Sequence, residues 1–324
     1  MTLVDRRFAI AATLAAALVV PAMPGAALAS DRLTVVTTTG MIADAASQVG
    51  GDLVAVEALM GPGIDPHAYR QTRSDIVATA QADLVLWHGL YLEAQMEDFL
   101  RDLAEKGRPV VAVGESLPTN LLIGHDDYPD RYDPHVWMNP NLWSRVVLTV
   151  RDSLIEAMPA GEQTFRANAA AHLAELDALA QYTTQVLSSV PAESRVLLSA
   201  HDAFNYFGSA YGFEVTGIQG ISTESEAGLQ RIAELVDMLV ERDIRAVFVE
   251  SSVSDRNIRA LIEGAAARGH EVVIGGELYS DAMGAPGTYE GTYLGMIDHN
   301  ATVIAAALGG DTPARGMADK LTLN

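Results

Sequence analysis

Hydrophobic and polar positions follow two alternating periods from residue 33 onward. Short runs rich in β-branched residues predict strands at residues 33–37, 54–59, 84–87 and 110–113. Between them, residues 41–49 and 92–105 carry apolar side chains at helical spacing. Strands that alternate with helices are typical of a parallel sheet with helices on both faces. The first half of the chain is therefore predicted to be an α/β lobe.

The middle of the chain has a different pattern. Residues 141–158 predict one helix that begins after Pro140. Residues 162–189 then form a pattern of roughly seven turns, rich in Ala, Leu, Glu and Gln and free of Gly and Pro. Prolines at 159 and 191 bracket this segment. A helix of this length would act as a stiff strut.

The second half resumes the alternation of strands and helices. Strands are predicted at residues 195–199, 214–218, 246–250 and 271–274. Helices are predicted at residues 204–211, 227–242, 255–268 and 289–308. We therefore expect two similar lobes, residues 30–160 and 191–324, each a mostly parallel sheet flanked by helices and joined by one long rigid helix, residues 161–190. Ligands of open α/β sheets bind at the carboxyl ends of strands, which places the expected site between the lobes.

Residues 1–29 have the features of an export signal. Arg6 and Arg7 form a positive end, residues 8–20 are apolar, and Ala27-Leu28-Ala29 is a typical cleavage site. An N-terminal membrane anchor is the alternative, and the paired arginines leave Sec and twin-arginine export both open. No later stretch approaches 18 uninterrupted apolar residues, so the mature chain is expected to stay out of the membrane.

Composition narrows the function further. The chain has 324 residues, a formal net charge of −21 and no cysteine. Such an acidic surface repels phosphate backbones, which argues against nucleic-acid binding. The lack of cysteine excludes disulfides, thiolate metal sites, cysteine nucleophiles and a lipid-modified cysteine within this sequence. With an export signal and no lipid anchor, the expected location is the periplasm.

Three of the eight histidines stand in similar settings. The tripeptide Asp-Pro-His ends at both His67 and His135, and His201 follows a predicted strand and precedes Asp202. A neighbouring carboxylate can accept the second N–H of an imidazole and orient it for a metal. The three histidines are far apart in the sequence, so isolated surface or core histidines remain the alternative at this point.

Four segments together resemble the zinc- and manganese-binding solute receptors of ABC importers. They are GPGIDPH at 61–67, DPHVWMNP at 133–140, HDAFNYF at 201–207 and LYSDAMG at 278–284. They occur in the order typical of that family, with its long central helix, and the resemblance covers almost the whole mature chain.

The resemblance implies a metal site at the lobe interface. Its ligands would be His67 and His135 from the first lobe and His201 and Asp281 from the second. Three imidazoles and one carboxylate suit tetrahedral Zn²⁺. Manganese receptors of the family commonly have a glutamate at the third position, so His201 favours zinc, with Mn²⁺ kept as the main or second metal in the alternative. The implied protein is a monomer that is not an enzyme and delivers its ion to an inner-membrane ABC permease.

Other residues have less specific expectations. Glu250, at the end of a predicted strand, is either a hydrogen-bonding partner or an alternative ligand. His88 is expected to line the cleft, and His172 to be solvated on the long helix. The loop 123–132 is either an auxiliary capture element or an ordinary solvated loop; its metal-catching groups would be His125, Asp126, Asp127 and Asp130.

A periplasmic zinc hydrolase is the competing class of function. Three histidines with one open position also describe catalytic zinc, and Asp281 decides whether that position is closed. No convincing general base stands beside the predicted ligands. No P-loop or dinucleotide-binding glycine motif occurs, so nucleotide binding is unsupported.

Overall fold

The computed structural model describes Thr2, residues 32–125 and residues 128–322. Apart from Thr2, the predicted export signal lies outside the described residues. The side chains of residues 125–130, where the acidic loop would capture metal, lie outside them as well. Within the described part of the chain, no helix has the length and apolar character needed to cross a membrane.

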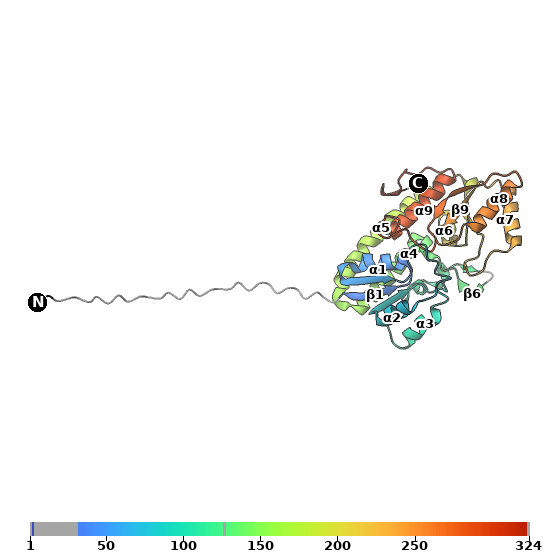
Figure 1. The fold of residues 1–324 in the computed structure, drawn as a ribbon. Helices are drawn as coiled ribbons and strands as arrows, with labels where there is room; N and C mark the ends of the chain where they lie inside the picture. The colour runs from blue at the N-terminus through green and yellow to red at the C-terminus, as the bar shows by residue number, and fades with distance from the viewer. Residues whose placement is uncertain (1, 3–31, 126–127, 323–324) are drawn as a thin grey trace. The chain divides into compact units, whose positions relative to one another are not determined.

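A four-stranded parallel sheet forms the centre of the N-terminal lobe (Figure 1). Its strands, in spatial order, are β2 (Val54–Ala58), β1 (Leu33–Thr37), β3 (Leu84–Trp87) and β4 (Val110–Ala112). All four residues of β3 are buried, as expected for an inner strand covered on both faces. Its helices are α1 (Gly40–Gly50), α2 (Arg73–Gln81), α3 (Glu97–Glu105) and α4 (Pro140–Ala157). The predicted α/β lobe is therefore present.

Two helices of this lobe differ from the prediction, and the predicted loop 123–132 contains a hairpin. Helix α2 was not predicted, because its sequence has little amphipathic pattern; Thr72 and Asp75 start it with a reciprocal capping box. Helix α3 begins at Glu97 rather than at residue 92. Leu90 and Tyr91 have left-handed backbone, with φ of 53° and 70°, and residues 91–96 form turns before the helix.

Short elements lie between the main strands and helices. An antiparallel hairpin of β5 (Gly124–His125) and β6 (Tyr128–Tyr132) precedes α4. Single-turn 3₁₀ helices lie at Gly51–Leu53, Gly114–Ser116, Thr119–Leu121, Val136–Met138, Pro159–Gly161 and Ala192–Ser194.

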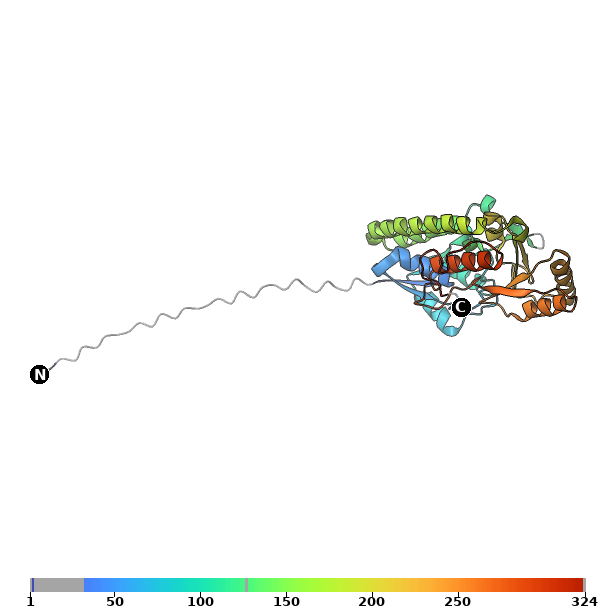
Figure 2. The same cartoon turned by 90° about the horizontal axis from the view of Figure 1, so that it is seen from above.

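The long helix α5 (Glu162–Ser188) agrees with the predicted strut. Its 27 residues span about 40 Å at 1.5 Å per residue. It packs against α1, α4 and the last helix, α9 (Tyr293–Ala307). Figure 2 shows α5 and α9 side by side. The strut is thus a packed element of the core on several sides.

The C-terminal lobe contains two parallel strand pairs. They are β7 (Val196–Ser199) with β8 (Glu214–Gly217), and β9 (Ala246–Glu250) with β10 (Val273–Leu278); β7 also lies next to β9. Helices α6 (Asn205–Tyr211), α7 (Leu229–Glu241) and α8 (Arg256–Ala266) precede α9. Strand β10 begins later than predicted and shifts register between Ile274 and Gly276, where a Cβ on Gly276 would collide with Val303 of α9.

The two lobes share buried contacts. The rings of Trp143 in α4 and Tyr293 in α9 stack with centroids 5.4 Å apart. The Tyr293 hydroxyl donates to the carbonyl of Trp137 at 2.6 Å, and the Trp137 indole donates to the carbonyl of Ser280 at 2.8 Å. Residues Arg32–Asn324 accordingly cluster as one unit, and the predicted lobe boundaries at 160 and 190 stay predictions.

Replacement of Tyr293 by phenylalanine tests this shared core. Tyr293→Phe leaves the buried Trp137 carbonyl without its side-chain donor, so the free energy of unfolding should fall by about 1–3 kcal/mol. Urea denaturation of the metal-free protein measures it. Tyr279→Phe is the matched control, because the Tyr279 hydroxyl is partly exposed and donates no hydrogen bond within the described residues. An equal effect of both substitutions would contradict the assignment.

Candidate metal centre

Four side chains from four separate loops converge between the lobes. His67 follows β2, His135 follows β6, His201 follows β7 and Asp281 follows β10. All four are buried, and one possible ligand atom of each lies within 4.8 Å of the others. Each lobe contributes two of them. The structure therefore brings together all four residues of the predicted set.

The spacing of these atoms matches a small metal shell. His135 Nε2 lies 3.3 Å from His67 Nε2 and 3.3 Å from His201 Nε2. The carboxylate oxygens of Asp281 lie 3.4 Å, 3.1 Å and 4.0 Å from the Nε2 atoms of His135, His201 and His67. A tetrahedron with bonds of about 2.0–2.1 Å has edges of about 3.3 Å. The four groups fit one ion of this size.

Carboxylates orient two of the imidazoles. His135 Nδ1 lies 2.7 Å from Asp133 Oδ1, and His201 Nδ1 lies 2.5 Å from Glu250 Oε2. Because a carboxylate only accepts, each Nδ1 carries a proton and donates it. In the neutral tautomer each Nε2 then has a lone pair, and these lone pairs face each other at 3.3 Å. Such an arrangement requires a cation or a proton at its centre.

Asp281 adds a negatively charged oxygen ligand group to the imidazole nitrogens. Its side chain is buried, and within the described part of the chain no group other than the site's own histidines is placed to donate a hydrogen bond to its carboxylate oxygens. Burial alone raises the pKa of Asp281, but the imidazoles of His201 and His135 hold that pKa well below its usual range. An ionised carboxylate without further donors is costly to bury unless it faces a cation. The site thus combines imidazole nitrogen with an anionic oxygen.

The metal-free centre retains protons that an ion would have to displace. Burial lowers the pKa of His135, but the Asp133 carboxylate outweighs this effect and raises it to about 9. Asp281 and Glu250 likewise raise the pKa of His201 against the effect of burial. Burial dominates at His67 and lowers its pKa to about 3. Metal ligation requires neutral imidazole, so binding would release protons.

The outer hydrogen-bond partners agree only in part with the prediction. Asp133 contacts the ring of its own tripeptide's histidine, as predicted. Asp65 instead accepts the backbone N–H of His67 at 2.9 Å. The expectation that Asp202 orients His201 was wrong. The ring of His201 contacts Glu250 instead, so Glu250 is a hydrogen-bonding partner, which is one of the two roles considered for it. The reason is topological, because the adjacent strand β9 delivers Glu250 beside β7.

Two further histidines also differ from expectation. His88 is fully buried, and its Nε2 donates to the carbonyl of Pro134 at 2.6 Å, one residue before a predicted ligand. His172 is not solvated on α5 but 3% exposed, because this helix is packed against α1, α4 and α9. Neither histidine belongs to the group that could hold a metal.

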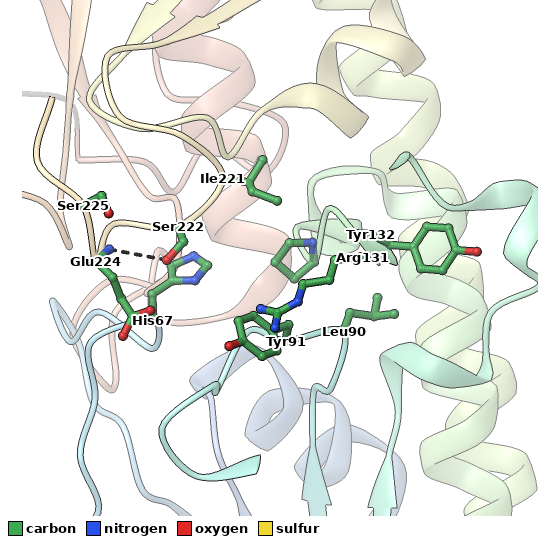
Figure 3. Close-up of a pocket in the computed structure, with 10 residues that line it drawn as sticks. His67, Leu90, Tyr91, Arg131, Tyr132, Ile221, Ser222, Glu224 and Ser225 are labelled. Atoms are coloured by element: carbon green, nitrogen blue, oxygen red, sulfur yellow. Dashed lines mark hydrogen bonds between the residues drawn. The ribbon is translucent and has the colours of Figure 1, made fainter. Parts of the chain in front are cut away.

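The centre adjoins two cavities. One, of about 150 Å³, is bordered by His67 together with Tyr91, Arg131 and Glu224 (Figure 3). The other, of about 290 Å³, is bordered by Asp281 and residues of both lobes, among them Met60. The four buried side chains therefore lie close to open space on two sides.

Comparison with known proteins places this geometry in a family. The sequence model described as "Zinc-uptake complex component A periplasmic" matches residues 35–307. The chain belongs to this family. Its members are metal-binding solute-binding proteins of ABC importers and not enzymes, so the hydrolase considered from the sequence is excluded.

Relatives in the zinc-uptake component family extend along most of the chain. The manganese-binding lipoprotein MntA of Bacillus subtilis is 48% identical over 280 residues, which cover 86% of this chain and 91% of the relative. The zinc-binding protein TroA of Treponema pallidum is 45% identical over 282 residues, covering 87% and 91%. The solved structure of periplasmic zinc-binding TroA matches with a TM-score of 0.83, covering 86% of this chain and 99% of that chain. The predicted two-lobed fold with a long connecting helix is confirmed.

Substitution of Asp133 tests the electrostatics of the centre. In Asp133→Asn the carboxylate that contributes most to raising the pKa of His135 is gone, and only Asp281 still opposes the effect of burial, so that pKa should fall from about 9. Around pH 8 the imidazole is then mostly protonated in the wild type and less protonated in the variant. NMR titration of the metal-free protein measures this change. Asp152→Asn, which changes an exposed carboxylate, is the control and should leave the pKa of His135 unchanged. An unchanged pKa of His135 in Asp133→Asn would contradict the role assigned to Asp133.

Proposed function

We propose that His67, His135, His201 and Asp281 are the ligands of a divalent cation, and that the protein captures Zn²⁺ in the periplasm for delivery to an ABC permease. One observation carries the proposal. Buried nitrogen lone pairs and a carboxylate without hydrogen-bond donors other than these histidines lie at the spacing of a tetrahedral shell. All four positions of that shell come from the protein, so the site suits holding an ion rather than activating a water.

Zinc is the favoured cargo because of the donor set. Imidazole nitrogen suits Zn²⁺, whereas Mn²⁺ favours oxygen ligands and has lower affinity for a given site. Three nitrogens and a single carboxylate make a small shell with edges near those of a zinc tetrahedron. The name of the Treponema relative, a zinc-binding protein, agrees with this choice.

Manganese is the second candidate, because the carboxylate of Asp281 can offer two oxygen atoms to one ion. Oδ1 lies near His135 and Oδ2 near His201, and neither oxygen has another hydrogen-bond donor within the described residues. Both oxygens are therefore available to one ion, which would raise the donor count to five and the share of oxygen with it. The Bacillus relative is named for manganese.

Release of the ion requires the ligands to separate. Because the lobes share the contacts around Tyr293, we propose small movements of residues 30–160 and 191–324 about the strut 161–190, rather than a wide hinge. Residues 1–29 would export the chain. Since the 324 residues contain no cysteine, we propose that the mature protein is free in the periplasm.

Alanine substitutions test the ligand set. His67→Ala, His135→Ala and His201→Ala should each weaken Zn²⁺ binding by more than about 100-fold, since loss of an outer hydrogen-bond partner alone costs 10–100-fold. Competition with a chelator of known affinity measures the effect. His172→Ala removes an equally buried histidine outside the site and should bind as the wild type does. A similar loss in this control would refute the assignment.

Metal preference is tested by direct competition. Metal-free protein incubated with equal Zn²⁺ and Mn²⁺, desalted and analysed by elemental mass spectrometry, should contain mainly zinc because of its three imidazoles. Asp281→Asn keeps one carbonyl oxygen and should lose Mn²⁺ more completely than Zn²⁺. Mainly manganese in the wild-type protein would overturn the choice of zinc and leave the ligand set standing.

A further inference from the structure

A single carboxylate links a ligand loop of the first lobe to a loop of the second. Asp65 Oδ1 accepts the backbone N–H of His67 at 2.9 Å. Its other oxygen, Oδ2, accepts the hydroxyl of Thr223 at 2.5 Å. Thr223 lies between β8 and α7 in the C-terminal lobe. The position of His67 is thus coupled through Asp65 to the opposite lobe.

The same loop makes a second bond across the interface. Gln95 Nε2 in the N-terminal lobe donates to Glu224 Oε1 at 2.5 Å. Both of these side chains are exposed, so water competes for this bond more than for the half-buried bond of Thr223. Two consecutive residues of one loop therefore attach to the other lobe at two points.

The loop also borders the open side of the metal centre. Ile221, Ser222, Glu224 and Ser225 line the cavity that His67 borders, together with Tyr91 (Figure 3). Ile221 is buried, whereas Glu224 is exposed, so the loop extends from the interior to the surface. An ion that left on the side of His67 would pass this loop.

We propose that residues 221–225 form an inter-lobe latch that retains the ion, with Thr223 and Asp65 as positioning residues that act through His67. This inference rests on the proposed function. While the latch is closed, Asp65 holds the loop of His67 in place and residues 221–225 cover the cavity beside it. When the Thr223 bond breaks, Asp65 loses its link to the C-terminal lobe, and the loop keeps only the exposed bond between Glu224 and Gln95. The latch should therefore slow release of the ion more than capture.

The latch is tested by substitutions that remove or keep the hydroxyl of Thr223. Thr223→Val keeps the shape and loses the donor, whereas Thr223→Ser keeps the donor. Stopped-flow transfer of Zn²⁺ to an excess of chromophoric chelator measures release, and a separate mixing experiment measures capture. Release from Thr223→Val should be roughly tenfold faster, because hydrogen bonds to a charged acceptor are the stronger ones. Capture should change less than about twofold, and Thr223→Ser should resemble the wild type.

Controls separate the latch from a general loss of structure. Thr184→Val removes a hydroxyl that bonds only to its own helix α5, and should leave release unchanged. Gln95→Ala removes the exposed bond without disturbing a buried group, and should accelerate release by a smaller factor than Thr223→Val. It also tests the latch if Thr223→Val folds poorly.

The outcomes distinguish the latch from the proposed function. Wild-type release rates in both Thr223→Val and Gln95→Ala would overturn the latch and would mean that the ion leaves elsewhere, for example beside Asp281. Equal acceleration of capture and release would also overturn it, since the loop would then be only a barrier. Failure of the wild-type protein to bind Zn²⁺ or Mn²⁺ would instead refute the proposed function.

Discussion

Three imidazole nitrogens and an ionised carboxylate share a buried space in which only a positive charge makes their proximity favourable. Asp133 and Glu250 hold the Nδ1 protons of His135 and His201, so the remaining lone pairs are directed inward. Asp281 adds negative charge without any donor other than these histidines in the described part of the chain to balance it. Protons supply the positive charge in the metal-free state, and a divalent ion supplies it better because it reaches all four groups at once.

The shared core of the lobes makes this convergence possible. Each lobe contributes two of the four groups, so the distances in the centre depend on how the lobes are placed. The stacked Trp143 and Tyr293, together with the packed strut α5, hold this placement. The loops have room to move, because the four side chains lie beyond strand ends beside two cavities. Loop movement of this kind fits a receptor that must both hold and surrender its ion.

Selectivity in such a centre depends on how many oxygens the ion meets. With one oxygen of Asp281 the shell is small and rich in nitrogen, which suits zinc; with both it is larger and suits manganese better. The loop that positions this carboxylate is bonded through Ser280 to the indole of Trp137 in the other lobe. Relatives of high similarity carry the names of both metals.

The sequence by itself determined the alternating architecture and the strut α5, because periodicity and the absence of Gly and Pro are local properties. The four predicted site residues were identified through motifs that resemble those of a known family. Their separation along the sequence does not indicate whether their side chains meet in the folded protein. Only the tertiary structure decided that Glu250, not Asp202, orients His201, and that His172 is buried. Both features depend on which elements lie side by side: β9 beside β7, and three helices around α5. Contacts between segments that are far apart in the sequence produce no periodic pattern in either segment, so the sequence alone does not reveal them.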